Sequence, residues 1–151
     1  MRIAIGSDHT GVALKESLRE QLIALGHEAF DLSALGGSGE GPVDYPDVAR
    51  PLAEAVAAGQ YDLGVLICSN GVGMSITANK VKGVRAALCH DTFSARRARQ
   101  HTDANILCLG SWCIGPGVAR EVLAAFLEGQ FEGGRHARRL DKIKAIEAQN
   151  L

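Results

Sequence analysis

Three largely apolar runs constrain the fold more than any other feature of this sequence. They span residues 64–68, 84–89 and 104–110, and none alternates apolar with polar side chains. A strand that is covered on both faces reads in this way, as in a parallel sheet. Stretches with apolar side chains at helical spacing separate the runs. We therefore expect an α/β fold: a Rossmann-like, doubly wound, mostly five-stranded parallel sheet with helices on both faces.

The same periodicity predicts the remaining elements. Further strands are expected at 2–6 and 28–32, and helices at 14–25, from 46 onward, and at 72–80, 92–100 and 116–128. A final helix carries Leu140, Ile143 and Ile146 on one face. Its pattern suits packing on its own domain or on a second subunit equally well. We find no internal repeat or linker, so residues 1–151 are expected to form a single domain.

Composition excludes several classes of function. The chain has 151 residues, with 16 Lys and Arg against 17 Asp and Glu, and this balance argues against a nucleic-acid or polybasic membrane binder. No apolar run approaches the roughly 18 residues of a membrane-spanning helix. The first residues enter a strand directly, without the features of a signal peptide, so we expect a cytoplasmic protein.

The cysteines do not have the spacing of a metal site. Cys68, Cys89, Cys108 and Cys113 include no Cys-x-x-Cys pair, so neither zinc nor another metal is expected. We interpret them as reduced thiols, two of them buried in strands.

Ligands of such a sheet bind beyond the carboxyl ends of its strands. Three clusters are expected there: 6–11, 68–75, and Asp91 with His101 nearby. The first is not a dinucleotide fingerprint, because Asp8 stands where that motif needs glycine. Asp31 could meet a ribose, but it is weak evidence alone, and no ATP-type or GTP-type phosphate loop occurs.

The second cluster suits an anion. Residues 69–73 can present several backbone N–H groups at a helix N-terminus, where negative charge is stabilised. Cys68 would lie at the rim of this positive concavity, which can activate a thiol. The alternative is a tight turn beside a half-buried cysteine.

Basic residues near the C-terminus form a second anion-binding candidate. Arg135 and Arg139 are four residues apart at a predicted helix start and can fork around a phosphate. The alternative is a solvated basic face, which we also expect for residues 96–99. His9 and His101 are each compatible with a core or a surface position.

Taken together, several motifs resemble the family of ribose-5-phosphate isomerase B and galactose-6-phosphate isomerase. They run over nearly the whole chain and comprise Gly6-Ser7-Asp8-His9-x-Gly11, Asp44-Tyr45-Pro46, Ile67-Cys68-x-x-Gly71-Val72-Gly73-Met74-Ser75-Ile76-x-Ala78-Asn79-Lys80, Gly83-Val84-Arg85-Ala86-Ala87, Arg99-Gln100-His101-x-Asp103-Ala104-Asn105 and Phe131-Glu132-Gly133-Gly134-Arg135-His136-x-x-Arg139. The resemblance implies cofactor-free interconversion of an aldose phosphate and a ketose phosphate. It also implies a homodimer or tetramer with shared active sites, in which Arg135 and Arg139 act beside Cys68 of the partner subunit.

The resemblance assigns roles to individual residues. His101 matches the ring-opening acid and base, and Cys68 matches the base that forms a cis-enediolate. Another branch uses a glutamate at the position of Met74, which cannot accept a proton. Backbone N–H groups of 69–73 would stabilise the enediolate. The substrate-binding residues implied are Asp8, His9, Tyr45, Ser69, Asn70, Gly71, Val72, Gly73, Thr102, Arg135 and Arg139.

Three positions depart from the family pattern. Asn70 replaces a frequent hydroxyl residue, Thr102 replaces an asparagine, and Trp112 replaces a phosphate-binding arginine. The expected reaction is the interconversion of ribose 5-phosphate and ribulose 5-phosphate. A six-carbon substrate such as allose or galactose 6-phosphate, with Trp112 reshaping the pocket, remains an alternative. A noncatalytic sugar-phosphate-binding module is the other.

Overall fold

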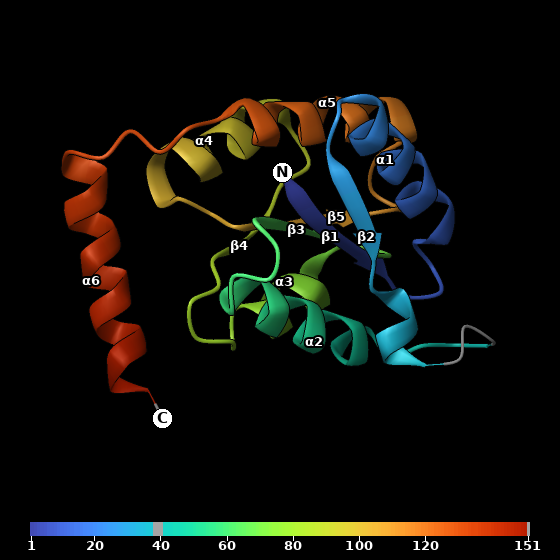
Figure 1. Cartoon of the computed structure of the whole chain (residues 1–151), viewed down its shortest axis with the longest axis horizontal. Coiled ribbons are helices and arrows are strands. Elements are labelled where there is room, and N and C mark those ends of the chain that lie inside the picture. Colours follow the sequence, from blue (N-terminus) through green and yellow to red (C-terminus); the bar gives the residue numbers. More distant parts are fainter. Residues whose placement is uncertain (38–40, 151) are drawn as a thin grey trace.

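The computed structural model describes residues 1–37 and 41–150 and contains the predicted parallel sheet (Figure 1). Its strands all run parallel, in the order β2-β1-β3-β5-β4. Their bounds are β1 Arg2–Ser7, β2 Glu28–Asp31, β3 Leu63–Cys68, β4 Ala86–Leu88 and β5 Ile106–Gly110. The central strands β3 and β5 are buried throughout, which explains why their sequences do not alternate.

Helices cover both faces of the sheet, as predicted. Helices α1, α4 and α5 lie on one face, and α2 and α3 lie on the other (Figure 1). The bounds are α1 Val12–Ala24, a short 3₁₀ helix η1 Ser33–Gly36, α2 Tyr45–Ala57, α3 Val72–Ala78, α4 Thr92–Thr102, α5 Pro116–Glu128 and α6 Arg135–Gln149. Each face has its own apolar core, with Phe126 and Leu18 in one and Leu52 and Met74 in the other.

The topology makes the carboxyl edge between β1 and β3 a switch point. These strands are neighbours, but α1 follows β1 onto one face while α3 follows β3 onto the other. The two connecting loops therefore diverge at the carboxyl edge, which is where open α/β sheets bind ligands. The loop after β1 stays close to β3, because the Asp8 N–H donates to the Ile67 carbonyl oxygen at 3.2 Å.

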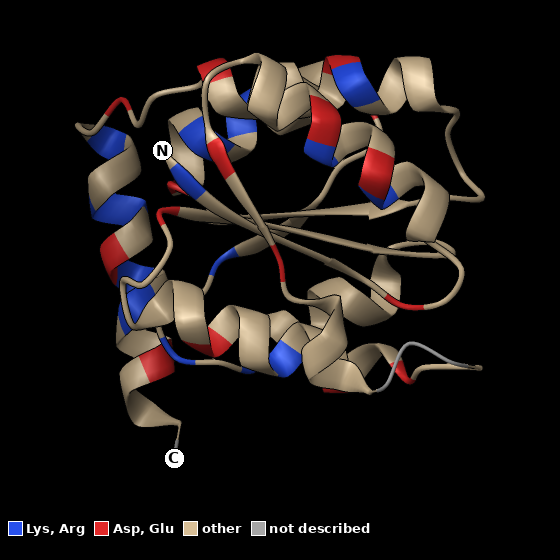
Figure 2. Ribbon diagram, turned by 45° about the vertical axis from the view of Figure 1, so that its right-hand side comes forward, with Lys and Arg blue, Asp and Glu red and all other residues tan. Residues whose placement is uncertain are grey.

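The last helix lies at the side of the layered body. Helix α6 packs against α4 near the amino edge of the sheet, and its far end is joined to the loop before β4, where the Gly83 N–H donates to the Glu147 Oε1 at 2.7 Å (Figures 1 and 2). Leu140 is buried, but Ile143 and Ile146 are 49% and 62% exposed. The predicted apolar face is therefore only partly covered by the chain's own residues.

Several expectations need correction. Strand β4 is shorter than predicted. Leu25 and Val118 have the spacing of the buried helix faces but are exposed to solvent. Residues 96–99 are not a uniformly solvated face, because Arg99 is mostly buried and donates to the Ala104 carbonyl oxygen at 2.6 Å. The glycine-rich segment 36–42 includes residues 38–40, which lie outside the described residues. No helix within the described residues is long and apolar enough to cross a membrane.

Candidate active site

Cys68 lies at the carboxyl end of β3, at this switch point, and packs into the apolar core on the α2 and α3 face. Its thiol is free and its residue is only 3% exposed. The Gly71 N–H donates to the Cys68 Sγ at 3.2 Å. A backbone donor aimed at sulfur stabilises negative charge on it, as a thiolate base requires.

Glycines allow the Cys68 loop to pack tightly against its neighbours. A Cβ at Gly110 would lie 2.6 Å from the Asn70 Cα, so the loop rests directly on β5. A Cβ at Gly73 would lie 2.5 Å from the Tyr45 ring, so this ring rests on the first turn of α3. The structure thus brings Tyr45, which the family resemblance assigns to substrate binding, to the helix that follows the Cys68 loop.

The anion cradle offers fewer free N–H groups than its sequence suggests. The Asn70 Oδ1 accepts the Val72 N–H at 3.1 Å, and the Gly71 N–H already faces the Cys68 sulfur. Asn70 therefore acts as a local turn-forming residue in place of a hydroxyl. Of the residues predicted to offer backbone N–H groups to a substrate, Ser69, Asn70 and Gly73 remain as candidates.

The loop after β1 supplies Asp8 and His9. The buried Asp8 accepts two hydrogen bonds at Oδ1, from the Thr10 N–H at 2.9 Å and the Thr10 hydroxyl at 2.6 Å. The exposed His9 ring has its Nδ1 3.1 Å from the Val43 nitrogen. The same Nδ1 lies 3.3 Å from the Val43 carbonyl oxygen. The main chain of Val43 therefore orients the His9 ring, and its Nε2 is left for an oxygen of a ligand.

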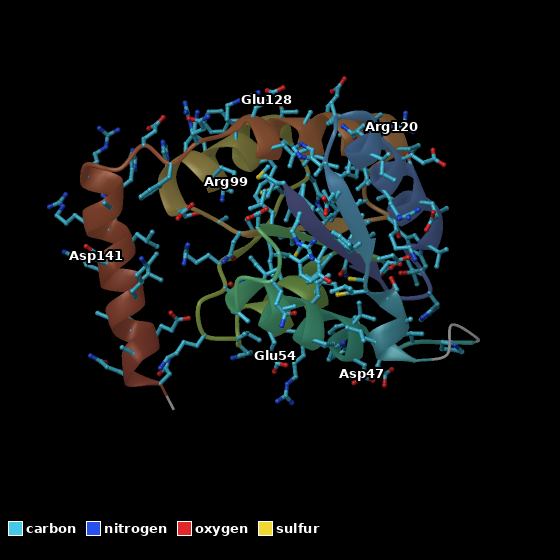
Figure 3. All side chains as sticks on the ribbon, viewed as in Figure 1. Asp47, Glu54, Arg99, Arg120, Glu128 and Asp141 are labelled. Carbon is cyan, nitrogen blue, oxygen red and sulfur yellow. The ribbon has the colours of Figure 1, made fainter. Side chains whose placement is uncertain are left out.

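Ser111 ties these loops together. Its N–H donates to the Cys68 carbonyl oxygen at 2.8 Å, and its hydroxyl donates to the Thr10 carbonyl oxygen at 2.9 Å. The exposed Trp112 ring follows, lining a cavity of about 590 Å³ between α1 and α5. Arg120, which also lines this cavity, is labelled in Figure 3.

His101 and Thr102 lie at the opposite edge of the sheet from Cys68. Helix α4 begins beside the carboxyl edge, where Asp91 caps it by accepting the Ser94 N–H at 2.7 Å. Its 11 residues run antiparallel to the strands, a length of about 16 Å. The expectation that His101 shares an edge with Asp91 is therefore wrong, because the helix carries His101 to the amino edge.

A cluster around His101 was missed by the sequence analysis. The His101 and His136 rings stack with centroids 4.0 Å apart and planes 8° apart. The Glu132 Oε1 lies 3.7 Å from the His101 Nε2 and 3.5 Å from the His136 Nε2. The available signal was the spacing of Glu132 and His136, which are four residues apart across the start of α6.

Electrostatics distinguish the two histidines. Burial lowers the pKa of His136, and the neighbouring His101 and Arg135 lower it further. His136 is therefore neutral near pH 7. Arg135 and Arg139 project from α6 nearby, exposed and without an ion pair among the described residues. They remain available for an anion.

The candidate ligand atoms of His101, Glu132 and His136 lie within 4.8 Å of one another. Stacking of the two rings and the contacts of both Nε2 atoms with the Glu132 carboxylate account for this proximity without a cation. Asp31 is not available to a nucleotide ribose, because it pairs with the buried Lys15 at 2.8 Å.

The fold and the carboxyl-edge site place the chain in the class of sugar-phosphate isomerases. It belongs to the Ribose/Galactose Isomerase family, whose model matches residues 3–143. D-erythrulose-4-phosphate isomerase of Pectobacterium atrosepticum is 44% identical over 99% of this chain and 97% of its own. Ribose-5-phosphate isomerase B of Escherichia coli is 44% identical over 97% and 96%. The structure of ribose-5-phosphate isomerase B from Clostridium thermocellum is 46% identical, with a TM-score of 0.93 and 99% of both chains covered.

Proposed function

We propose that this isomerase interconverts ribose 5-phosphate and ribulose 5-phosphate, at an active site shared between two copies of the chain. The observation that carries the proposal is the buried Cys68 thiol with the Gly71 N–H on its sulfur, at the switch point between β1 and β3. Pure binding would not need a thiol in this environment. Reduced free cysteines also fit a cytoplasmic enzyme.

The reaction needs three proton movements. Ring opening breaks the C1–O4 bond of the cyclic sugar, removes a proton from O1 and adds one to O4. The Cys68 thiolate then removes the proton from C2, giving a cis-enediolate whose negative charge faces the backbone N–H groups of the loop. A proton then returns to C1, O1 gains a proton and O2 loses one, which leaves the carbonyl at C2. The ketose therefore forms without any redox partner.

We assign substrate binding to two regions, the carboxyl edge of the sheet and the start of α6. Asp8, His9 and Tyr45 lie at the carboxyl edge and contact substrate hydroxyls or phosphate. Arg135 and Arg139 hold the phosphate as a fork and so fix the reacting carbon relative to Cys68. This role requires the arginines to reach a Cys68 that is not their own, because they lie at the amino edge.

Uncovered apolar side chains support a second copy. Around the carboxyl edge the exposed apolar residues are Val12, Val72, Ile76, Phe93 and Trp112. Helix α6 adds Ile143 and Ile146. Exposed apolar groups that gather in this way mark protein interfaces. A homodimer that seats the start of α6 over the carboxyl edge of its partner would cover apolar residues of that edge and complete two sites.

The test is isomerisation of ribose 5-phosphate by the purified protein with a chelator present. Cys68→Ala should reduce turnover by about 100-fold or more, because general base catalysis is lost. Cys113→Ala is the matched control, since this thiol is exposed and lies 3.9 Å from the Ser69 carbonyl oxygen. Full activity of Cys68→Ala would refute the base assignment.

The substrate is tested on the same preparation. Four-carbon and six-carbon sugar phosphates are compared with ribose 5-phosphate by kcat/KM. A clear preference for the four-carbon substrate would align the chain with the Pectobacterium relative. Tight binding of sugar phosphates without any turnover would replace the isomerase with a binding module.

A further inference from the structure

The cluster at the end of α4 contains groups to which the mechanism above gives no task. Glu132 and His136 surround His101, the residue assigned to ring opening, but neither is a matched substrate-binding residue. We propose that Glu132 is a positioning residue that fixes the tautomer and orientation of His101, with the buried His136 as the platform beneath its ring. The inference rests on the proposed function for the role of His101 itself.

The backbone holds Glu132 against the last turn of α4. Its N–H donates to the Gln100 carbonyl oxygen at 3.0 Å, next to His101 in the chain. Gly129 allows the preceding segment to approach α4, because a Cβ there would lie 2.7 Å from the Arg99 Cβ. Main-chain contacts thus hold the Glu132 backbone beside His101.

One carboxylate oxygen faces both imidazoles. The Glu132 Oε1 lies 3.7 Å from the His101 Nε2 and 3.5 Å from the His136 Nε2. An ionised carboxylate accepts hydrogen bonds and cannot donate them, so it favours the tautomer with an N–H at each Nε2. The His101 lone pair is then on Nδ1, the nitrogen that is free to meet a substrate.

His136 fixes the plane of the His101 ring. Its side chain is 7% exposed, whereas that of His101 is 35% exposed. The nearly parallel stack at 4.0 Å leaves His101 little freedom to rotate about its side-chain bonds. A neutral His136 adds no charge to repel a proton arriving on His101, and its lowered pKa is consistent with this part.

This arrangement suits the proton balance of ring opening. Nδ1 takes the proton from O1 as the C1–O4 bond breaks, and the resulting imidazolium gives a proton to O4. Glu132 stabilises the imidazolium between the two transfers, as the carboxylate does in a carboxylate–histidine pair. The carboxylate never touches the substrate, so its effect must act through His101.

The test separates ring opening from proton abstraction at carbon. Ribose 5-phosphate is cyclic and needs the ring-opening step. Ribulose 5-phosphate is open-chain, because the oxygen that would close its five-membered ring carries the phosphate. Conversion of the first is followed by ketose formation, and the Cys68 step on the second is followed by deuterium uptake at C1 in heavy water.

Glu132→Gln should slow conversion of ribose 5-phosphate by about 10-fold or more, in line with the loss of part of a general acid–base contribution. Deuterium uptake into ribulose 5-phosphate should stay within about twofold, since the Cys68 region is intact. Glu128→Gln is the matched control, because this exposed carboxylate, labelled in Figure 3, pairs with Arg96 at 3.5 Å and not with a histidine. It should leave both rates unchanged.

Two results would overturn the proposal. Equal loss of both rates in Glu132→Gln would mean a general structural or binding role, and unchanged rates would mean no role. A nitrogen NMR spectrum of the histidine rings supplies a readout without activity. His101 should show its proton on Nε2 in the parent protein and lose that preference in Glu132→Gln. If the parent protein fails to convert ribose 5-phosphate, the proposed function is wrong, while the NMR result still decides whether Glu132 sets the tautomer.

Discussion

The two halves of the candidate site are held in place by different means. At the carboxyl edge, main-chain contacts fix the Cys68 loop, which rests on Gly110 and receives the Ser111 N–H. At the amino edge, one main-chain hydrogen bond holds Glu132 beside α4, but ring stacking and carboxylate contacts orient the His101, Glu132 and His136 side chains. We therefore expect the carboxyl-edge half to be the more rigid of the two.

Charge follows the same division. The buried Lys15 near the carboxyl edge is neutralised by Asp31 at 2.8 Å. Arg135 and Arg139 on α6 have no such partner within residues 1–37 and 41–150, and Figure 2 shows basic residues clustered at this end of α6. An uncompensated cation pair at the surface is suited to an anion, as the proposed shared site requires.

The largest effect should come from mixing two inactive variants. Cys68→Ala disables the carboxyl-edge half, and Arg135→Ala with Arg139→Ala disables the amino-edge half. If sites are shared across a twofold interface, each mixed dimer has one intact site and one doubly damaged site. An equal mixture that exchanges subunits should recover about a quarter of parental activity, by the statistics of a symmetric dimer. Activity is measured on ribose 5-phosphate before and after subunit exchange.

Each variant alone supplies the baseline for that experiment. Subunit exchange is verified separately by native mass spectrometry, because the two variants differ in mass and the mixed dimer has its own mass. A mixture that stays as inactive as its components, despite proven exchange, would show that each site is built from one chain.

The rigidity of the carboxyl-edge half is tested by Gly110→Ala. The new methyl group would meet Asn70 backbone atoms at 2.6–2.9 Å, so the loop must move away from β5. A shift of this size in a catalytic loop costs about 100-fold in turnover when the geometry is as demanding as proton transfer. Gly117→Ala, which has open space around its Cβ position, is the matched control and should be neutral. Parental kcat in Gly110→Ala would mean that the loop tolerates displacement.

The charge contrast predicts a pH-dependent stability effect for Asp31→Asn. Burial raises the pKa of Asp31, but hydrogen bonds from Lys15 and Ser33 and the Lys15 charge outweigh it, so the folded pKa is lowered from 3.8. A lowered pKa means that the stabilisation is present above the unfolded value and is lost as the pH falls through the folded one. At pH 7 the variant should lose about 1.5–3 kcal/mol of unfolding free energy, as for a hydrogen bond to a charged group.

Denaturant unfolding at pH 7 and pH 3 measures this effect. The gap between the parent protein and Asp31→Asn should narrow at the lower pH. Glu28→Gln serves as the control, because Glu28 pairs with Arg2 at 3.3 Å with both side chains more than half exposed. It should change stability little at either pH. A gap that is the same at both pH values would exclude the Asp31 carboxylate as its source.

Local patterns predicted the strands and helices well, because each element carries its own periodicity. The lack of alternation in β3 reported burial on both faces, and the boundaries of α5 coincide with the predicted segment. The neighbours of Cys68 were also predictable, since the carboxyl ends of parallel strands share an edge. His101 was misplaced because its position depends on the direction of α4, and the Glu132–His136 cluster depends on how residues 129–134 return to that helix. Such contacts have no periodic signature.

The smallest effect is expected at Trp112, because a substitution there leaves both the Cys68 loop and the His101 cluster in place. The family resemblance predicts an arginine there, and the sequence suggested that the ring reshapes the substrate pocket. The structure places the ring of Trp112, a residue that is 77% exposed, beside the cavity between α1 and α5, while the Trp112 main-chain N–H donates to the Ser69 carbonyl oxygen at 2.9 Å. Trp112→Arg keeps that main-chain bond and adds a cation beside the Cys68 loop.

We expect Trp112→Arg to change the ratio of kcat/KM between five-carbon and six-carbon sugar phosphates by about 2- to 10-fold, the range of one hydrogen bond. A change confined to KM would mean that the new cation contacts phosphate in the ground state and the transition state alike. Trp112→Phe is the control, because it removes the indole without adding charge. If Trp112→Arg leaves the ratio unchanged, the tryptophan does not select the substrate. Discrimination would then lie with Asp8, His9 and Tyr45, which the rigid carboxyl-edge half presents.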